Sequence, residues 1–136
     1  MKRARNKPQP AIDELEAVFK ALADKTRLRI LALLGNNEVC VCHLHDSLDV
    51  PQPTVSRHLA YLRRSGLVDV RRDGVWKHYQ VARSLDPAVQ TVLNAAVEAL
   101  TGIRTTAHDR NQFQRSFGQL YVMRTPTGGA CCAPRA

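Results

Sequence analysis

Aromatic residues are scarce in this sequence, because Phe, Trp and Tyr together make up 5% of its 136 residues. A core with so few aromatic rings must be built from Leu, Val, Ile and Ala, which is more typical of packed helices than of a β-sandwich or barrel. Long apolar runs are also lacking. The longest strictly aliphatic run, residues 30–34, is far shorter than the roughly 20 residues of a membrane-spanning helix, and no hydrophobic signal segment follows the basic start. We therefore expect one small helical domain in the cytoplasm, with no membrane partner.

The motifs of several enzyme classes are missing as well. The chain has no Gly-rich phosphate loop, no Gly-x-Ser-x-Gly nucleophile elbow and no His-Glu-x-x-His metalloprotease motif. None of its cysteines is followed by an arginine at the Cys-x5-Arg spacing of an anion-binding catalytic loop. We therefore expect that the protein is not an enzyme and that it carries no organic cofactor.

Acidic residues are outnumbered, and the excess positive charge is concentrated in separate segments. The chain has 20 Lys and Arg against 12 Asp and Glu. Residues 1–7, 51–79 and 102–136 each carry a net charge of +4, whereas residues 8–50 carry −3. A basic middle segment with basic arms on either side indicates a polyanionic partner such as nucleic acid.

Composition divides the chain into three parts. Residues 1–9 are basic and almost without apolar side chains, which predicts a mobile arm. Residues 10–102 carry the periodic apolar patterns of a folded domain. Residues 103–136 are predicted to be a flexible tail, with at most a weak amphipathic turn or two around Phe113, Phe117 and Leu120, that ends in a vicinal cysteine pair.

The central part predicts a mainly α fold with a small β-hairpin. Asp24 and Asp86 are good N-caps for helices, Pro87 suits a first helical turn, and Asp73-Gly74 is a strong hairpin signal. The last helix has an apolar stripe too wide for a lone surface helix, so we expect it to pack against a partner. The predicted elements are helices at about 11–22, 24–34, 39–48 and 52–65, strands at 68–72 and 75–81, and a helix at 86–101.

Two helices that meet at a tight corner, followed by a hairpin, make a winged helix-turn-helix. In that arrangement the second helix enters the major groove of DNA and the hairpin lies over the phosphate backbone. Val55, Leu59 and Leu62 form the apolar face of this helix, while its front and opposite side carry hydrogen-bond donors. The expected DNA contacts are Gln52, Thr54, Ser56, Arg57 and His58 in the helix, and Arg71, Arg72 and Lys77 around the hairpin.

Four cysteines form two closely spaced pairs, Cys40-Val-Cys42 and Cys131-Cys132. These spacings are too short for ordinary disulfides within each pair, so metal or redox chemistry is the better interpretation. Thiolates are soft ligands, and Cys40 and Cys42 lie near the predicted start of a helix, where the dipole favours the deprotonated form. Since residues at i and i+2 point about 200° apart on an α-helix, we expect a shared ion to distort that first turn.

Five separated motifs in this chain resemble the bacterial ArsR/SmtB metal-responsive repressors, in the same order and at the family's spacing. The resemblance spans roughly residues 11–101. Its motifs are ALADKTRLRILALL at 21–34, EVCVCHL at 38–44, QPTVSRHL at 52–59, LRRSGLV at 62–68 and DGVWKHY at 73–79. It implies a homodimer, joined through the first and last helices of the domain, that represses its own operon until a toxic metal or metalloid releases it from double-stranded operator DNA.

The resemblance implies arsenite, As(III), as the inducer, with Sb(III) as a related one. Arsenic sensors of the family that carry Cys-Val-Cys often have a third cysteine three residues after the second, and here that position is His45. Three interpretations stay open: two-coordinate arsenite, a third thiolate from Cys131 or Cys132, or a borderline ion such as zinc, cadmium or lead with histidine taking part. The metal-binding candidates are therefore Cys40, Cys42, Cys131 and Cys132.

Other functions compete with arsenic sensing. The zinc-sensing branch of the family carries an Asp-x-His motif on its last helix, but residues 84–101 contain no histidine, so we expect no zinc site there. A repressor whose thiols sense oxidation would use the same cysteines. A thiol buffer or metallochaperone would need the cysteines but not the donor-rich helix face, and that face argues against it.

Overall fold

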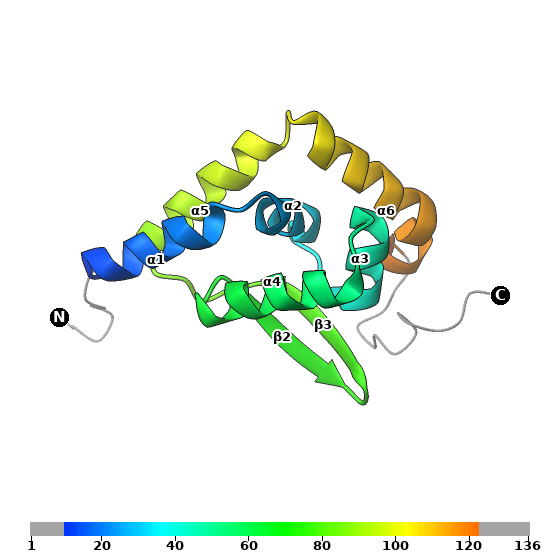
Figure 1. The fold of residues 1–136 in the computed structure, drawn as a ribbon, viewed down its shortest axis with the longest axis horizontal. Coiled ribbons are helices and arrows are strands. Elements are labelled where there is room, and N and C mark those ends of the chain that lie inside the picture. Colours follow the sequence, from blue (N-terminus) through cyan, green and yellow to red (C-terminus); the bar gives the residue numbers. More distant parts are fainter. Residues whose placement is uncertain (1–9, 123–136) are drawn as a thin grey trace.

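The computed structural model describes residues 10–122, and in this part of the chain the helices pack together while a β-hairpin extends away from them (Figure 1). Cys131 and Cys132 lie outside the described residues. The elements, in chain order, are α1 (Ile12–Leu22), α2 (Lys25–Leu34), β1 (Val39–Cys40), α3 (Val41–Leu48), α4 (Gln52–Arg64), β2 (Val68–Asp73), β3 (Trp76–Val81), α5 (Pro87–Leu100) and α6 (Arg104–Val122).

Local signals place most helix ends where the sequence predicts them. The Asp24 carboxylate accepts a hydrogen bond of 3.0 Å from the Arg27 backbone N–H at the start of α2, and the Asp86 carboxylate accepts one of 2.9 Å from Ala88 at the start of α5. Gly35, with φ of +51°, ends α2 in a conformation that favours glycine. These caps confirm the predicted boundaries of α2 and α5.

The sheet has three strands in the order β1-β3-β2, all antiparallel. The hairpin of β2 and β3 confirms the predicted wing, and its turn passes through Gly74 at φ +66°. The strand β1 was not predicted, because two residues are too short to show an alternating pattern. It pairs Val39 with Tyr79 and Cys40 with His78, so α3 begins only at Val41.

The core is mainly aliphatic, as the scarcity of aromatic residues requires. α2 is its centre, and the predicted inner face of α4 (Val55, Leu59 and Leu62) is fully buried against it. No helix within residues 10–122 is both long enough and apolar enough to cross a bilayer. The predicted winged helix-turn-helix architecture is confirmed.

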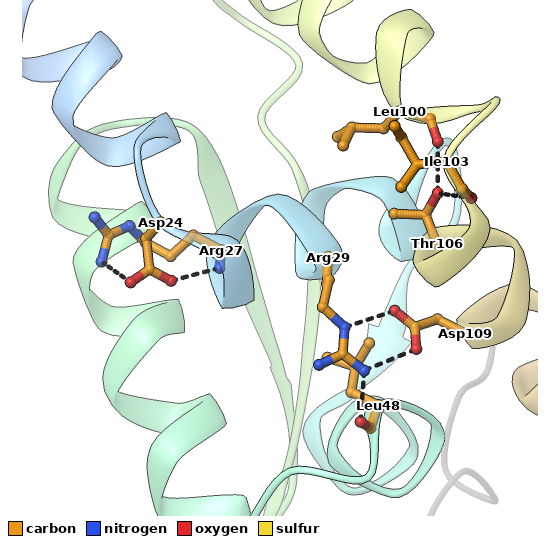
Figure 2. Close-up of polar contacts among 8 residues, drawn as sticks. All are labelled: Asp24, Arg27, Arg29, Leu48, Leu100, Ile103, Thr106 and Asp109. Atoms are coloured by element: carbon orange, nitrogen blue, oxygen red, sulfur yellow. Dashed lines mark hydrogen bonds and ion pairs between the residues drawn. The ribbon is translucent and has the colours of Figure 1, made fainter.

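The helix α6 is the main departure from prediction. The expectation of a flexible tail over 103–136 is wrong for the 19 residues of Arg104–Val122, which form a helix packed on α3 and α2 (Figure 1). Phe113 and Phe117 are buried in the core as the predicted apolar face, whereas Leu120 is exposed. The hydroxyl of Thr106 donates to the carbonyls of Leu100 and Ile103, which ties the start of α6 to the end of α5 (Figure 2).

An ion pair whose carboxylate is buried anchors α6 to the helix-turn-helix. The Arg29 guanidinium of α2 donates two hydrogen bonds of 2.8 Å to the Asp109 carboxylate of α6, and a third of 2.7 Å to the Leu48 carbonyl at the end of α3 (Figure 2). Asp109 is 1% exposed. The hydrogen bond with Asp109 raises the pKa of Arg29, which outweighs the opposing effect of its burial. Residues 104–122 have weak helix propensity and a weak apolar pattern, so α6 depends on packing against distant residues such as Arg29. The local sequence pattern does not reveal such a partner.

A second polar cluster holds α4 against α1 and α2. Arg27 donates from Nε to the Ala21 carbonyl at 2.7 Å and from Nη2 to the Lys20 carbonyl at 3.0 Å, at the end of α1. Its guanidinium lies 4.0 Å from the ring centre of Tyr61 on α4, and its Nη1 lies 3.2 Å from Nδ1 of His58. This side chain therefore fixes the position of α4 relative to α1.

Removing the charge of Asp109 is expected to destabilise the protein. In Asp109→Asn the half-buried Arg29 guanidinium keeps its hydrogen bond to Leu48 but loses its counter-charge, and a partly desolvated charge without a counter-charge is costly. We expect the free energy of unfolding in urea to fall by about 2 kcal/mol. The matched control is Glu98→Gln on the exposed side of α5, which should change stability by less than about 0.5 kcal/mol. Equal stability of the two variants would contradict this anchoring role.

The charge of Asp24 is expected to stabilise the fold above its own pKa. Burial opposes ionisation of this carboxyl, but the hydrogen bond from the Arg27 N–H and the positive charges of His58 and Arg27 outweigh it, so the pKa of Asp24 lies below its ordinary value near 3.8. A lowered folded-state pKa contributes stability that is complete above the unfolded value and is lost as the pH falls through the folded one. Wild type should therefore be more stable at pH 6 than Asp24→Asn, which keeps the cap, as measured by urea unfolding. The difference should shrink as the pH falls below 3.8 and through the lowered pKa of Asp24.

Candidate nucleic-acid interface and cysteine site

The outer face of α4 carries most of the predicted DNA-reading side chains. Arg57 is exposed, and Gln52 and Ser56 lie one turn apart, with the Gln52 amide donating to the Ser56 hydroxyl at 3.2 Å. Thr54 is half-buried in the first turn. The corner before this helix is made by Asp49, which takes the left-handed conformation at φ +56° and ends α3. The structure thus brings four of the five predicted helix residues to the front of α4.

His58 is the fifth, and it is placed differently. Its side chain is 17% exposed and turns back toward α2, where Nδ1 lies 3.8 Å from Asp24 and 3.2 Å from the Arg27 guanidinium. Helical periodicity groups His58 with Arg57 and Tyr61, but it does not reveal that Asp24 and Arg27 stand beside this part of the helix. His58 therefore supports the position of α4 rather than standing on its open face.

The three basic residues of the hairpin also divide into two kinds. Arg72 and Lys77 are exposed and lie directly opposite each other on β2 and β3. Arg71 instead donates two hydrogen bonds, of 2.8 and 2.9 Å, to the Glu38 carboxylate. Because β1 and β2 lie on either side of β3, this ion pair connects the segment before β1 to the wing across the middle strand.

Cys40 and Cys42 lie at the junction of β1 and α3, and their sulfur atoms are 3.0 Å apart. Cys40 is the N-cap of α3, with the extended backbone angles φ −70° and ψ 145°, and Cys42 is the second helical residue. The expectation that the two sulfurs can meet only by distorting a helical turn is wrong, because Cys40 is not in the helix. The backbone conformation of the fold itself therefore brings the two sulfur atoms together.

The cysteine pair has buried neighbours on two sides. Cys40 is 1% exposed and stands opposite the buried His78 in the sheet. His43, next to Cys42, stacks on Phe117 of α6 with ring centres 4.0 Å apart. His45 is half-buried in the next turn of α3. Within residues 10–122 no group of three His, Cys, Asp or Glu side chains is arranged to hold a metal ion.

The two cysteines open onto a groove of about 720 Å³ between α4 and the wing. Gln52 and Ser56 of α4 line this groove together with Cys40 and Cys42. The other lining residues are Val41, Ala60, Arg63, Arg64, Val75, Trp76, Lys77 and Tyr79. Burial raises the pKa of Tyr79 despite the nearby charges of Arg63 and Arg72, so this phenol stays a neutral hydrogen-bond donor at neutral pH. The candidate DNA surface and the cysteine pair therefore share one groove.

Several groove residues were missed by the sequence analysis. Arg63 and Arg64 end α4 and contribute to the net charge of the basic segment 51–79, and that charge excess is the signal that could have identified them. Trp76 begins β3 and stands half-buried in the groove. No local sequence pattern identifies Trp76 as a groove residue, because its place in the groove depends on how the hairpin packs beside α4.

Comparison with known proteins gives a consistent result. Residues 24–70 match the family described as "Bacterial regulatory protein, arsR family". The arsenical resistance operon repressor of Escherichia coli K12 is 45% identical over 80 residues, which are 58% of this chain and 68% of that protein. Among solved structures, HlyU from Vibrio cholerae N16961 has a TM-score of 0.58 at 31% identity, over 65% of this chain and 92% of that one.

A further solved structure bears on assembly. The DNA-binding domain of Mb0332 from Mycobacterium bovis, a winged helix-turn-helix described as homodimeric, is 32% identical with a TM-score of 0.55. The similarity covers 65% of this chain and 79% of that one.

Proposed function

Because this chain belongs to the arsR family of bacterial regulatory proteins, a family of DNA-binding regulators rather than enzymes, we propose that it is an arsenite-responsive transcriptional repressor. It binds double-stranded operator DNA as a homodimer and dissociates when trivalent arsenic, or antimony, binds the sulfur atoms of Cys40 and Cys42. The observation that carries this proposal is the 3.0 Å separation of those sulfurs in a groove that the front of α4 also lines.

Operator recognition rests on α4 and the wing. Arg57, exposed on the outer face of α4, has the donor geometry for a guanine edge or a phosphate, and Gln52, Thr54 and Ser56 supply further donors in the same turns. Arg72 and Lys77 reach the phosphate backbone from the hairpin. His58 and Arg71 act indirectly, because their partners hold α4 and the wing at a fixed separation.

Inducer binding rests on thiolate chemistry. Trivalent arsenic is a soft centre that prefers sulfur to imidazole or carboxylate. Cys40 and Cys42 supply two thiolates, and Cys131 or Cys132 supplies the third. The similarity to an arsenical resistance operon repressor supports arsenic as the inducer.

Dimerisation rests on α1 and α5. Phe19 is 54% exposed and Ile12 is 78% exposed on α1, so two large apolar side chains face away from the core of this subunit. α5 buries Val89 and Leu93, whereas its other apolar residues are half-buried, as Val92, Ala96 and Val97 are, or exposed. A second copy that covers these side chains would remove them from water, which favours association. The relative described as homodimeric supports association into a dimer.

Coupling between the two sites follows from their shared groove. Arsenic on Cys40 and Cys42 stands between the start of α3, the front of α4 and the wing. A ligand lowers operator affinity only to the extent that it binds the DNA-free form more tightly. Any displacement of α4 from the wing changes the spacing between base contacts and phosphate contacts, so arsenic binding and DNA binding oppose each other.

Soft-metal sensing and oxidation sensing use the same two cysteines. Zinc, cadmium or lead would recruit a nitrogen ligand, and His45 is the nearest candidate by sequence. Oxidation would act on the same thiols, and its effect on DNA binding would be reversed by a reductant.

Arsenite is expected to release labelled operator DNA from the reduced protein, as followed by fluorescence anisotropy. Cys40→Ser/Cys42→Ser should abolish release while it keeps DNA binding, and Cys131→Ser/Cys132→Ser should weaken release, because each removes thiolate ligands but no DNA contact. Cadmium and zinc are titrated in parallel. If only cadmium or zinc released the DNA, we would conclude that the site binds such an ion and includes His45 as a ligand. No release by any ion, with release by oxidant that a reductant reverses, would establish oxidation sensing instead.

The two kinds of DNA contact are expected to respond differently to substitution. Arg57→Ala should lower operator affinity by roughly tenfold and relax sequence preference, because it removes a bidentate contact. Lys77→Ala should weaken all sequences alike and reduce the slope of log K against log salt by about 1. Arg83→Ala, which removes an exposed charge outside α4 and the hairpin, is the control. An unchanged operator affinity in Arg57→Ala would contradict the assignment of α4 as the reading helix.

A further inference from the structure

The groove between α4 and the hairpin has two walls. The α4 wall consists of residues that recur at helical spacing: Gln52, Ser56, Ala60, Arg63 and Arg64. The hairpin wall consists of Val75, Trp76, Lys77 and Tyr79. The enclosed volume of about 720 Å³ lies within the range of roughly 300–1,000 Å³ that is typical of small-molecule sites. The groove is therefore large enough for an organic ligand.

The charge of the groove favours an anion. Arg63, Arg64 and Lys77 line it, and all three side chains are exposed. Within residues 10–122 no Asp or Glu is among the lining residues. Cationic side chains on both walls create a positive potential between them, because no carboxylate of the lining neutralises it. A negatively charged ligand is therefore the complementary class.

The phenol of Tyr79 indicates where the negative group would lie. Tyr79 is 9% exposed. Burial raises the pKa of Tyr79, and the charges of Arg63 and Arg72 act against this rise, so both guanidinium groups lie near the phenol hydroxyl. A carboxylate accepts two hydrogen bonds from one guanidinium and still has lone pairs for a hydroxyl donor. Arg63 and Tyr79 together therefore suit one carboxylate group.

The remaining surface of the groove suits a flat ring. Trp76 is half-buried and lines the groove three residues before Tyr79 on β3, about 10 Å away along the strand. Val41 and Ala60 add aliphatic surface. An aromatic ring gains from contact with indole and guanidinium planes beyond the area that it buries. A ligand with a carboxylate at one end and a planar ring at the other matches both features.

We propose that this groove binds a small planar aromatic carboxylate, with the carboxylate at Arg63 and Tyr79 and the ring against Trp76. The site requires no bond to the sulfur of Cys40 or Cys42, so it is a second ligand site beside the proposed arsenic site. Binding of this ligand is independent of the proposed function, whereas its effect on operator DNA rests on that function.

The ligand would also oppose operator binding. Gln52 and Ser56 line the same groove at the front of α4, and Lys77 lines it from the wing. A bound carboxylate would place a negative charge between these two DNA-contacting elements, where it repels phosphate groups and occupies space. Operator DNA and the aromatic carboxylate are therefore expected to exclude each other.

Isothermal titration calorimetry of the full-length protein without DNA tests the site directly. The probe is 2-naphthoate. Its amide, 2-naphthamide, keeps the rings but has no charge, and decahydro-2-naphthoate keeps the charge but has no planar ring. We expect 2-naphthamide to bind roughly tenfold more weakly than the probe, since it loses charge-assisted hydrogen bonds, and decahydro-2-naphthoate roughly fivefold more weakly.

Substitutions in the two halves of the site should separate recognition of the charge from recognition of the ring. Arg63→Gln should weaken binding of 2-naphthoate roughly tenfold and leave that of 2-naphthamide unchanged. Trp76→Ala should weaken binding of both by roughly fivefold, and Trp76→Phe should restore most of the loss. Arg83→Gln removes an exposed charge outside the groove and should change neither affinity. The free energy of unfolding in urea, measured for each variant, checks that the fold is kept.

Competition with DNA is measured by fluorescence anisotropy of labelled operator. At ten times its own dissociation constant for wild type, 2-naphthoate should raise the operator Kd of wild type by about tenfold. At the same concentration it should raise the operator Kd of Arg63→Gln by only about twofold, because that variant binds the ligand more weakly.

The outcomes separate this inference from the proposed function. Equal affinity for 2-naphthoate and either analogue, or binding that Arg63→Gln and Trp76→Ala leave unchanged, would overturn the site. Tight binding without any change in operator affinity would overturn the competition with DNA. None of these results bears on release by arsenite through Cys40 and Cys42. Conversely, failure of arsenite to release operator would refute the proposed function and leave the calorimetric result as it stands.

Discussion

The pairing of β1 with β3 is the constraint on which the candidate site depends. Only two residues form β1, yet they fix the backbone of Cys40 in an extended conformation and make it the N-cap of α3. Without that pairing the helix could begin earlier, and the two cysteines would project from different sides of its first turn. With it, the sulfurs lie 3.0 Å apart. The same pairing attaches the wing to the helix-turn-helix, so the ligand site and the DNA surface share one structural connection.

The arginines of this basic chain have two distinct roles. Three arginines make structural contacts. Arg27 contacts backbone carbonyls and the ring of Tyr61. Arg29 binds Asp109, and Arg71 binds Glu38. Their charges are largely compensated or buried, so they contribute little to long-range attraction of DNA. In the segment 51–79, the exposed residues Arg57, Arg63, Arg64, Arg72 and Lys77 remain for that purpose. Net charge alone therefore overestimates how many basic side chains are available to a nucleic-acid partner.

The helix α6 places a further restraint on the first helix of the DNA-binding unit. Its Asp109 holds Arg29, which also binds the carbonyl at the end of α3, and its Phe117 stacks on His43 near the start of α3. α3 is thus held at both ends, and its first turn contains Cys42, which lines the groove.

Short-range chemistry in the sequence determined the caps, the hairpin and the inner face of α4, because Asp24, Asp86 and Gly74 act within a few residues of their own position. The same reasoning identified Cys40 and Cys42 as a pair. Only the tertiary structure decided how that pair is presented, since β1 is too short to leave a pattern and exists only through β3. It also turned His58 toward Arg27, bound Arg71 to Glu38, and formed α6 from a segment with little helical signal of its own. In each of these cases the deciding partner lies more than thirty residues away in the chain or on another strand, and contacts over such distances depend on how the whole chain packs, which local periodicity does not encode.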